Sequence, residues 1–449
     1  MRNILLRGGR VVDPSQDLDS RLDLLISDGT IAEIAESIEA GSDVREIDLG
    51  GAVVAPGLVD MHVHLRDPGR EDEETIASGS EAAVHGGVTA LAAMPNTEPA
   101  IDTPSWVEYV RTRSHLIDVH PIAAITVGRR GETLTEMAEL AAAGAVAFSD
   151  DGSPVASARV MRRALEYADM VGRPVVSHCE DLDLVGDGVA NEGLASTISG
   201  LRPSPAAAED VAVARDVILA GATGARVHIA HVSTRGSVQI VRRAKADGIR
   251  VTCETCPHYF ALTDDAVRSY DTSLRINPPL RSEEDVAAIR TGLADGTIDA
   301  IASDHAPHSL EEKQVEFDAA PPGAIGLETL LPVTITHLVE TGVIGLARAI
   351  ELLSASPARI LRIEGGTLAR GARADVTVFD PARSWTLERA WFRSKSKNSP
   401  FIGATLLGRV AITISKGRIV FEEGPAPEGA PDNAHEERAA DVGELPLRA

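Results

Sequence analysis

Short apolar segments separated by turn residues occupy both ends of the chain. Near the start, NILLRGGRVVD is followed by DLLISDGTIAEI, in which Asp28-Gly29 is a two-residue hairpin signal. Near the end, ADVTVFD, ATLLGRVAITI and RIVFEE follow a similar pattern, with a turn at Lys416-Gly417. Neither end holds enough strands for a stable separate sheet. We therefore expect residues 1–55 and 365–423 to pair into one composite β-sandwich domain.

The middle of the chain, residues 56–364, alternates short apolar runs with amphipathic helical patterns. The helical patterns include SARVMRRALEYADMVG and SVQIVRRAKADG, and several of them end in glycine. Such alternation indicates a parallel sheet covered by helices. The apolar runs are LVDMHVH, VTALAAMPN, VHPIAAITV, AVAFSDD, PVVSHCE, RVHIAHVS, IRVTCETC and DAIASDH. Eight units predict an α/β fold with a (β/α)₈ TIM barrel, and an open doubly wound sheet is the alternative.

Polar side chains recur near the C-terminal ends of these predicted strands, where barrel active sites are built. His62 and His64 are two positions apart on one strand, so both side chains face the same way. Two imidazoles turned into a core need partners, because an unpaired buried polar group costs roughly 1–3 kcal/mol. A metal ion would satisfy both. The candidate ligands are His62, His64, Asp151, His178, His231 and Asp304.

Six nitrogen and oxygen ligands are too many for one tetrahedral zinc ion with an open position, so two metal ions are expected. Imidazole and carboxylate fit zinc, and Mn, Co or Fe remain open. Two ions about 3.5–4 Å apart would share a hydroxide and polarise a carbonyl. This arrangement suits the hydrolysis of amides and esters.

Other histidines and the cysteines have a structural interpretation. Lone histidines such as His228, His258 and His337 are more often hydrogen-bonded core or surface residues than ligands. The C-x-x-C spacing of Cys253 and Cys256 has no second pair to complete a zinc site. Both cysteines, and Cys179 as well, are expected in the core or in loops. Three cysteines cannot form a disulfide framework, which favours a cytoplasmic location.

Charge and composition narrow the class of partner. The 449 residues carry 43 Lys and Arg against 67 Asp and Glu, a net charge of −24. This balance repels phosphate backbones and anionic bilayers, so neither nucleic acid nor a membrane is expected as a partner. No glycine-rich phosphate loop is present. Part of the negative charge lies in residues 424–449, which are interpreted as an acidic, disordered tail.

Several motifs together resemble one enzyme family. The stretches GLVDMHVHLRDPG, AAMPNT, AFSDDG, SHCED, HIAHVST, CPHYF, RINPPLR and SDHAPH are similar to those of the metal-dependent amidohydrolases. The arginine after the HxH pair, the MPNT segment and the DDG at the fourth strand resemble the dihydroorotases of the long bacterial type. The segment KSKNSPFIG also resembles that family. The likeness runs from about Pro56 to Lys416, which is most of the chain.

The resemblance implies a role for each candidate ligand. His62, His64 and Asp304 would hold one zinc ion, and His178 and His231 the other. Asp151 would bridge the two ions, with Asp150 as its rival. Many relatives bridge with a carboxylated lysine on the fourth strand, but no lysine precedes Lys245 here. The chain therefore fits the branch whose bridge is an aspartate.

The resemblance also implies a substrate that carries a carboxylate. Arg66 can offer a bidentate fork to that group, and Asn96 can donate through its amide. The segment 308–327 is expected to form a lid or wall at the rim of the eighth strand. The expected substrate-binding residues are His64, Arg66, Asn96, Asn277, His308, Pro322 and Gly323.

The implied reaction is the reversible cyclisation of N-carbamoyl-L-aspartate to L-dihydroorotate in pyrimidine biosynthesis, with Asp304 as general acid and base. A hydantoinase or allantoinase is one alternative. A non-catalytic scaffold for aspartate transcarbamoylase is the other, although such chains have lost metal ligands. A homodimer is expected, and association with aspartate transcarbamoylase is a further possibility.

Overall fold

The computed structural model describes residues 3–39 and 41–424, and its central feature is a parallel barrel of eight strands. The strands follow one another around the sheet in chain order. A parallel bridge between Val63 and His305 joins the two edges, and the His64 amide donates to the His305 carbonyl at 2.8 Å. The predicted barrel is thus confirmed and the open sheet is excluded. Its strands are β6 (Leu58–Val63), β7 (Val88–Ala93), β8 (Asp118–Ala123), β9 (Ala147–Phe148), β10 (Val175–Ser177), β13 (Val227–Ile229), β14 (Val251–Thr255) and β15 (Ala300–Ile301).

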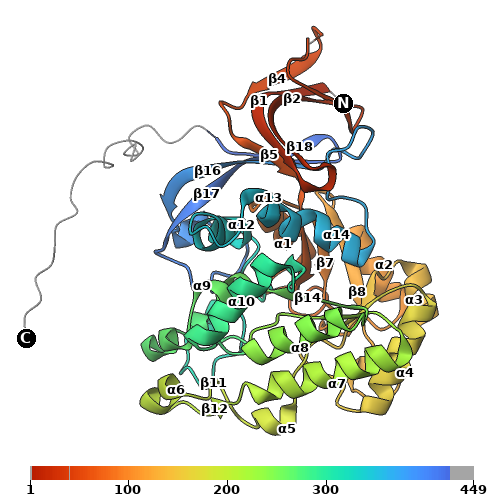
Figure 1. Ribbon diagram of the computed structural model, residues 1–449, viewed down its shortest axis with the longest axis vertical. Helices are drawn as coiled ribbons and strands as arrows, with labels where there is room; N and C mark the ends of the chain where they lie inside the picture. The colour runs from red at the N-terminus through yellow and green to blue at the C-terminus, as the bar shows by residue number, and fades with distance from the viewer. Residues whose placement is uncertain (1–2, 40, 425–449) are drawn as a thin grey trace, which may run out of the picture.

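Helices pack around this barrel and bury their apolar faces against it (Figure 1). Their first turns are fixed by side-chain caps: Ser157 accepts from the amide of Val160, and Ser282 forms a capping box with Asp285. The long helices are α1 (Ile76–His85), α2 (Pro104–Arg113), α3 (Met137–Ala143), α4 (Ala158–Met170), α7 (Ala207–Thr223), α8 (Arg235–Ala246) and α10 (Glu283–Asp295). After β15 come α12 (Leu330–Thr334), η5 (Ile335–Val339), α13 (Leu346–Ile350), η6 (Glu351–Ala355) and α14 (Ser356–Leu361).

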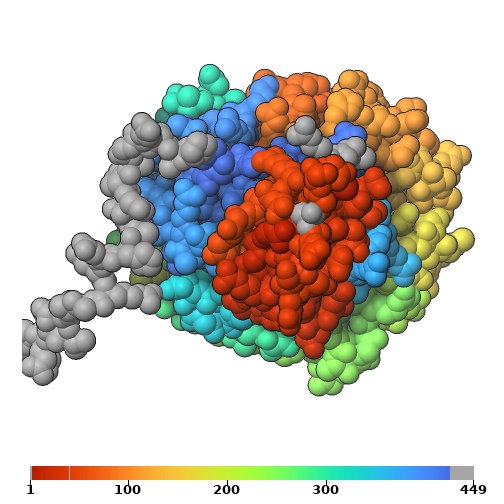
Figure 2. All heavy atoms as spheres, turned by 90° about the horizontal axis from the view of Figure 1, so that it is seen from above, coloured from red at the N-terminus to blue at the C-terminus, as the bar shows by residue number. Residues whose placement is uncertain are grey.

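Strands from both ends of the chain form a second sheet, as predicted. Its hydrogen-bonded order is β18-β17-β16-β5-β1-β2-β3, with β4 paired to β1. Leu6, Leu24 and Ile31 from one end share a buried cluster with Val376 and Ile414 from the other. Figure 2 shows the red N-terminal segment flanked by blue C-terminal segments. The strands are β1 (Asn3–Asp13), β2 (Leu18–Ser27), β3 (Thr30–Ala35), β4 (Val44–Asp48), β5 (Val53–Pro56), β16 (Val376–Thr386), β17 (Thr405–Ser415) and β18 (Arg418–Glu422).

The two predicted hairpin turns hold the ends of this sheet together. Asp28 and Gly29 have φ angles of 49° and 82°, and Lys416 and Gly417 have 52° and 72°. Two consecutive positive φ values suit a tight hairpin. The turns touch, since a Cβ on Gly417 would lie 2.4 Å from the Cα of Gly29. Glycine is therefore required at residue 417 by space as well as by conformation.

Short elements after the barrel strands build up the face that carries the polar residues. In Figure 1 the elements α5, α6, β11 and β12 lie at the end of the barrel remote from the composite sheet. The acidic segment predicted from residue 424 onwards lies outside the described residues, except for Gly424. The short elements that follow barrel strands are η2 (Val127–Arg129), α5 (Leu182–Val185), β11 (Ala190–Asn191), α6 (Leu194–Ser199), β12 (Pro203–Ser204), α9 (Pro257–Ala261), η3 (Asp264–Ser269), η4 (Thr272–Leu274) and α11 (Leu310–Lys313). Two further short elements, η1 (Pro14–Gln16) and η7 (Arg389–Trp391), connect strands of the composite sheet.

Among residues 3–39 and 41–424, no helix combines the length and the apolarity needed to cross a membrane.

Candidate metal centre and substrate pocket

The barrel brings all six predicted metal ligands to one place. His62 lies in β6 with His64 just after it, and the other four follow the C-terminal ends of β9, β10, β13 and β15. All six side chains are buried, so the polar cluster is enclosed by the barrel and by the segments that follow its strands. This is the face where barrel enzymes place their active sites.

The carboxylate of Asp151 lies at the centre of the cluster. Its Oδ1 atom is 3.4 Å from Nε2 of His62 and 3.5 Å from Nδ1 of His178. The same oxygen is 3.7 Å from Nε2 of His231, and Oδ2 is 3.6 Å from Nε2 of His64. Asp151 therefore contacts both expected halves of the centre, which is the position that a bridging ligand requires.

Asp304 and the remaining histidine pair complete the cluster. Oδ1 of Asp304 is 3.0 Å from Nε2 of His64 and 3.5 Å from Nε2 of His62. On the other side, Nδ1 of His178 and Nε2 of His231 are 2.8 Å apart. Imidazole nitrogens that come from different barrel strands thus lie close to one another and to the carboxylate of Asp304.

Burial and charge act in opposite directions on these groups. Burial raises the pKa of Asp151, but His62, His178 and His231 outweigh it and hold that pKa well below its usual value. Burial lowers the pKa of His62, whereas Asp151 and Asp304 raise it well above the ordinary value. The cluster therefore favours ionised carboxylates.

Two buried atoms in the cluster lack hydrogen-bond partners within the described chain: Nε2 of His62 and Oδ1 of Asp151. Buried polar atoms are rarely left unpaired, and each orphan calls for an explanation. Imidazole nitrogens and carboxylate oxygens suit divalent metals such as zinc. The residues present therefore fit a metal centre. Within the six predicted ligands, two groups have ligand atoms within 4.8 Å of one another: His62, His64 and Asp304, and His62, Asp151 and His231.

Asp150, the rival bridge, has its carboxylate engaged elsewhere. Its Oδ1 accepts from the amides of Ile125 at 2.8 Å and Thr126 at 3.1 Å, and Oδ2 accepts from the Thr126 hydroxyl. Asp150 thus ties the end of β9 to the loop after β8. This geometry favours Asp151 for the bridging position.

A second set of carboxylates orients the histidines, and the sequence interpretation missed it. Oε1 of Glu254 is 2.6 Å from Nδ1 of His62, and Oε2 is 3.3 Å from Nε2 of His228. Burial raises the pKa of Glu254, but the two histidines lower it to about 2. Carboxylates behind metal-binding histidines fix ring orientation and strengthen the ligand. The sequence did contain a signal for this role, a glutamate inside a predicted buried strand. A buried carboxylate is rare unless it is paired, which implies a charged or polar partner for Glu254.

Glu180 has the corresponding place behind His178. Its Oε2 is 3.3 Å from Nε2 of His178 and accepts from Nδ2 of Asn277 at 3.0 Å. Asn96, on the other side, accepts from Nδ1 of His64 at 2.7 Å through Oδ1. Both asparagines predicted to bind substrate thus lie at the edge of the histidine cluster.

The remaining predicted substrate residues form a wall beside the cluster. Nη2 of Arg66 is 3.4 Å from Nε2 of His308, and Nε of Arg66 donates to the Pro307 carbonyl at 3.1 Å. Nε2 of His308 also lies 2.9 Å from the carbonyl oxygen of Pro322. A cavity of about 430 Å³, lined in part by His308 and Lys313, lies on this side.

The Pro322-Gly323 backbone is held by a residue that the sequence interpretation did not single out. Nδ2 of Asn398 donates to the carbonyls of Gly323 and Ala306, each at 3.1 Å. A side chain at Gly323, whose φ is 142°, would lie 2.7 Å from the Cβ of Ala306. Asn398 belongs to the KSKNSPFIG segment, which thus supports the wall from behind.

Three predicted site residues have left-handed backbone conformations that non-glycine residues rarely adopt. The φ angles are 59° for Arg66, 34° for His231 and 48° for Asp304. Such residues cost of order 1–3 kcal/mol each and cluster at functional sites. These backbone conformations are an observation independent of the side-chain chemistry. They also mark the C-terminal face of the barrel as the functional face.

The cysteines are free and buried, in keeping with a structural role. Cys256 nevertheless forms a compact group with His258 and Asp304, whose ligand atoms lie within 4.8 Å of one another. Burial lowers the pKa of His258 to about 4. His258 is therefore a neighbour of the cluster rather than a remote core residue.

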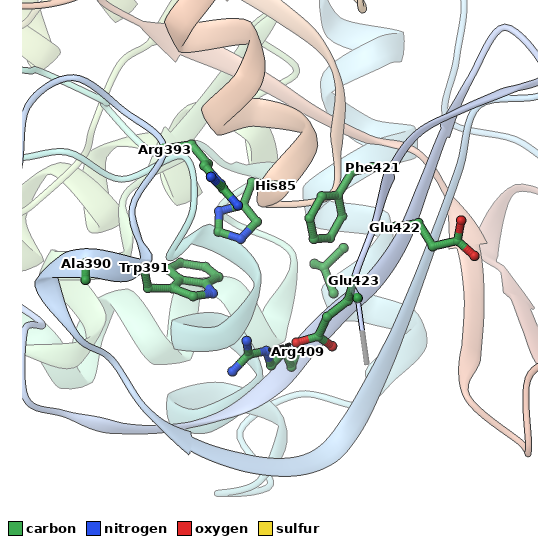
Figure 3. Close-up of a pocket in the computed structure, with 10 residues that line it drawn as sticks. His85, Ala390, Trp391, Arg393, Arg409, Phe421, Glu422 and Glu423 are labelled. Atoms are coloured by element: carbon green, nitrogen blue, oxygen red, sulfur yellow. Dashed lines mark ion pairs between the residues drawn. The ribbon is translucent and has the colours of Figure 1, made fainter. Parts of the chain in front are cut away.

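A separate cavity of about 290 Å³ lies where α1, η7, β17 and β18 meet (Figure 3). His85, Trp391 and Phe421 line it, and Nε of Arg409 lies 2.6 Å from Oε1 of Glu423. This cavity shares no residue with the histidine cluster.

Comparison with known proteins agrees with this geometry. A family model described as dihydro-orotase-like matches residues 51–237. The dihydroorotase of Geobacter sp. (strain M21) is 55% identical over 94% of this chain and 100% of its own length. The dihydroorotase of Citrifermentans bemidjiense is 54% identical with the same coverage.

Solved structures give the same fold. The L-hydantoinase (dihydropyrimidinase) from Arthrobacter aurescens aligns with a TM-score of 0.86 and 27% identity, covering 95% of this chain and 97% of that one. The dihydropyrimidinase from Brevibacillus agri NCHU1002 aligns with a TM-score of 0.83 and 23% identity, covering 94% of this chain and 95% of that one, a likeness in fold alone.

The barrel, its composite sheet and the enclosed histidine–aspartate cluster define an amidohydrolase, an enzyme that hydrolyses cyclic amides with the help of metal. Within that class, identity above 50% over nearly the whole length decides the family. The chain belongs to the dihydroorotase family.

Proposed function

We propose that this enzyme catalyses the reversible cyclisation of N-carbamoyl-L-aspartate to L-dihydroorotate in pyrimidine biosynthesis. The observation that carries the proposal is the position of Asp151 among four histidines, with the Arg66–His308 wall beside it. A binuclear centre next to a fixed guanidinium suits a cyclic amide that bears a carboxylate.

The proposed centre holds two zinc ions. One would be bound by His62, His64 and Asp304, and the other by His178 and His231, with Asp151 between them. When bound, the ions supply Lewis-acid polarisation of the ring amide carbonyl and lower the pKa of a water molecule. Glu254 and Glu180 keep the imidazoles of His62 and His178 oriented for this task.

Asp304 is proposed to move the proton. Burial raises its pKa, but His62 and His64 lower it far below its ordinary value, so the group is present as the ionised carboxylate. In hydrolysis Asp304 takes a proton from the attacking water and delivers it to the leaving ring nitrogen. In ring closure the protonated carboxyl group acts as the acid.

The substrate carboxylate is proposed to bind Arg66. The Nε of Arg66 donates to Pro307, which leaves Nη1 and Nη2, the latter beside His308, for a bidentate contact. Asn96, Asn277, His308 and the Pro322-Gly323 backbone are proposed to enclose the remaining polar atoms of the substrate.

The alternatives have weaker support. Hydantoinases share the fold, but the L-hydantoinase is only 27% identical, against 55% for the dihydroorotase of Geobacter sp.. A catalytically silent scaffold would not need the complete set of ligands that this chain brings together. We further propose a cytoplasmic location, which three free cysteines support. The homodimer and the association with aspartate transcarbamoylase stay predictions.

The reaction can be tested from both sides. Purified metal-loaded protein is incubated with L-dihydroorotate or with N-carbamoyl-L-aspartate, and both compounds are quantified by chromatography. We expect both incubations to reach the same ratio of ring to open form at a given pH. Conversion of neither compound by protein with a full metal complement would contradict the proposal.

A further inference from the structure

A buried glutamate that none of the metal ligands touches lies behind the substrate wall. Glu73, in the segment between β6 and α1, is only 1% exposed. A carboxylate at such depth requires charged or polar partners, because an unpaired buried charge is strongly destabilising. The identity of those partners indicates what Glu73 does.

Both oxygens of Glu73 face residues of the proposed substrate pocket. Oε2 is 3.2 Å from Nε of Arg66, and Oε1 is 3.0 Å from Nδ1 of His308. Oε1 is also 3.3 Å from Nη2 of Arg70. The hydroxyl of Ser396 donates to the Glu73 backbone carbonyl at 2.8 Å, which holds the glutamate itself in place.

We propose that Glu73 is a positioning residue that orients Arg66 and His308 for the carboxylate-bearing substrate. This inference rests on the proposed function, since it gives Arg66 and His308 their roles. Glu73 contacts the guanidinium at Nε, and Nη2 of the same group lies beside His308. Its contact with Nδ1 of His308 leaves Nε2 on the side of Arg66 and Pro322.

The same carboxylate also connects the wall to the loop after β15. Arg70, which contacts Glu73, lies with Nη2 2.6 Å from Oε1 of Glu312 in α11. Oε2 of Glu312 is 3.4 Å from Nδ1 of His308. Arg66 and Arg70 come from the β6 side, and His308 and Glu312 from the β15 side. Glu73 therefore holds together two loops that must both be in place before the substrate binds.

The neighbouring glutamate does not share this role. Glu74 accepts from the hydroxyl of Ser394 and the amide of Lys395, and lies 3.4 Å from Nε2 of His305. Its partners belong to the scaffold behind the wall. The function is therefore assigned to Glu73 alone of this adjacent pair.

The first test is Glu73→Gln, which keeps the size of the side chain but replaces one oxygen with an NH₂ group that cannot accept from Arg66 or His308. We expect the KM for L-dihydroorotate to rise about 10-fold, with kcat changed less than about 3-fold and metal content unchanged. A fall in kcat at an unchanged KM would overturn the proposal, and so would unchanged values of both.

The matched control is Glu328→Gln. Glu328 is 2% exposed and accepts from Nδ1 of His85 at 2.6 Å and from the Arg393 amide at 2.7 Å, but it has no contact with Arg66 or His308. The change is chemically identical and equally buried. We expect a lower melting temperature with an unchanged KM. An equal rise in KM in both variants would reduce Glu73 to a general structural role and overturn the proposal.

The second test asks whether Glu73 acts through Arg66. In the Arg66→Met background, Glu73→Gln should lower kcat/KM by a smaller factor than it does in the wild type, because only His308 is left for Glu73 to position. If the double variant lost kcat/KM by the product of the two single-variant factors, Glu73 and Arg66 would act independently, and the proposal would be overturned. The wild-type enzyme separates the two levels of inference: absence of dihydroorotate turnover contradicts the proposed function, whereas turnover with a normal KM in Glu73→Gln contradicts only the role of Glu73.

Discussion

Asp150 and Asp151 are adjacent in the chain, yet their carboxylates have opposite surroundings. Asp151 faces four histidines at 3.4–3.7 Å, whereas Asp150 accepts hydrogen bonds from Ile125 and Thr126. One aspartate thus supplies charge to the candidate metal centre, and the other fastens the loop that carries it.

Because their surroundings differ, the same substitution to asparagine should have different effects at residues 151 and 150. Asp151→Asn should lower both metal content and activity, the latter by at least about 100-fold. Asp150→Asn should keep its metal but lose about 1–3 kcal/mol of unfolding free energy, because its hydrogen-bond acceptors are altered. Elemental analysis after dialysis and urea denaturation measure the two effects.

We expect the wild-type protein to bind two metal ions per chain. A protein that is fully active with one ion, or a larger loss of metal and activity in Asp150→Asn than in Asp151→Asn, would contradict Asp151 as the bridging ligand.

Arg66 should determine affinity for a charged substrate. Arg66→Met removes a charge-assisted contact worth roughly 1.5–3 kcal/mol, so the KM for L-dihydroorotate should rise about 10- to 100-fold. Steady-state kinetics in both directions measure this change. An unchanged KM would make Arg66 a structural residue and favour a neutral cyclic ureide as the substrate.

Asp304 should be needed for proton transfer more than for metal retention. Asp304→Asn keeps an oxygen that can still act as a ligand but cannot accept the proton. We expect most of the metal to remain while kcat falls roughly 10²- to 10⁴-fold. Metal content and turnover are measured on the same preparation. Near-normal turnover with two ions bound would reject this role and leave His308 as the next candidate.

His120 should make the fold sensitive to acid. Burial lowers the pKa of this histidine in β8 from 6.5 to about 4, with Asp118 opposing that shift. Between about pH 6.5 and 4 the unfolded chain binds a proton that the folded protein excludes, so stability falls as the pH falls. The loss reaches at most about 3 kcal/mol.

His120→Gln should therefore flatten the dependence of unfolding free energy on pH over this range, as measured by urea denaturation. The exposed His115 supplies the control variant, His115→Gln, in which the slope should stay as in the wild type. An identical slope in all three proteins would show that His120 does not contribute.

The strands and turns were predictable because their signals are local. The eight apolar runs and the hairpin turns at Asp28-Gly29 and Lys416-Gly417 are contained in a few consecutive residues each. The third run, VHPIAAITV, contains the strand β8, which pairs with neighbours on both sides. The placement of His62 and His64 followed from the rule that strand ends meet on one face.

The residues that support the site were not predictable in this way. Glu254 meets His62 across 192 positions, and Glu73 meets His308 across 235. Such contacts depend on how the barrel closes and not on any local pattern. Glu254 lies between Cys253 and Cys256, and the sequence analysis considered only the two cysteines. A charged residue inside a buried apolar run was nevertheless a signal that a partner exists. Asn398 belongs to the segment KSKNSPFIG, which resembles the family, but the sequence did not indicate which residues Asn398 contacts.

The most direct test of the central claim is a comparison of substrates with the purified, metal-loaded enzyme. Values of kcat/KM are measured side by side for L-dihydroorotate, hydantoin and allantoin. The account predicts a preference of at least about 10- to 100-fold for L-dihydroorotate, because only that compound offers a carboxylate to Arg66. Faster turnover of hydantoin or allantoin than of L-dihydroorotate would contradict it.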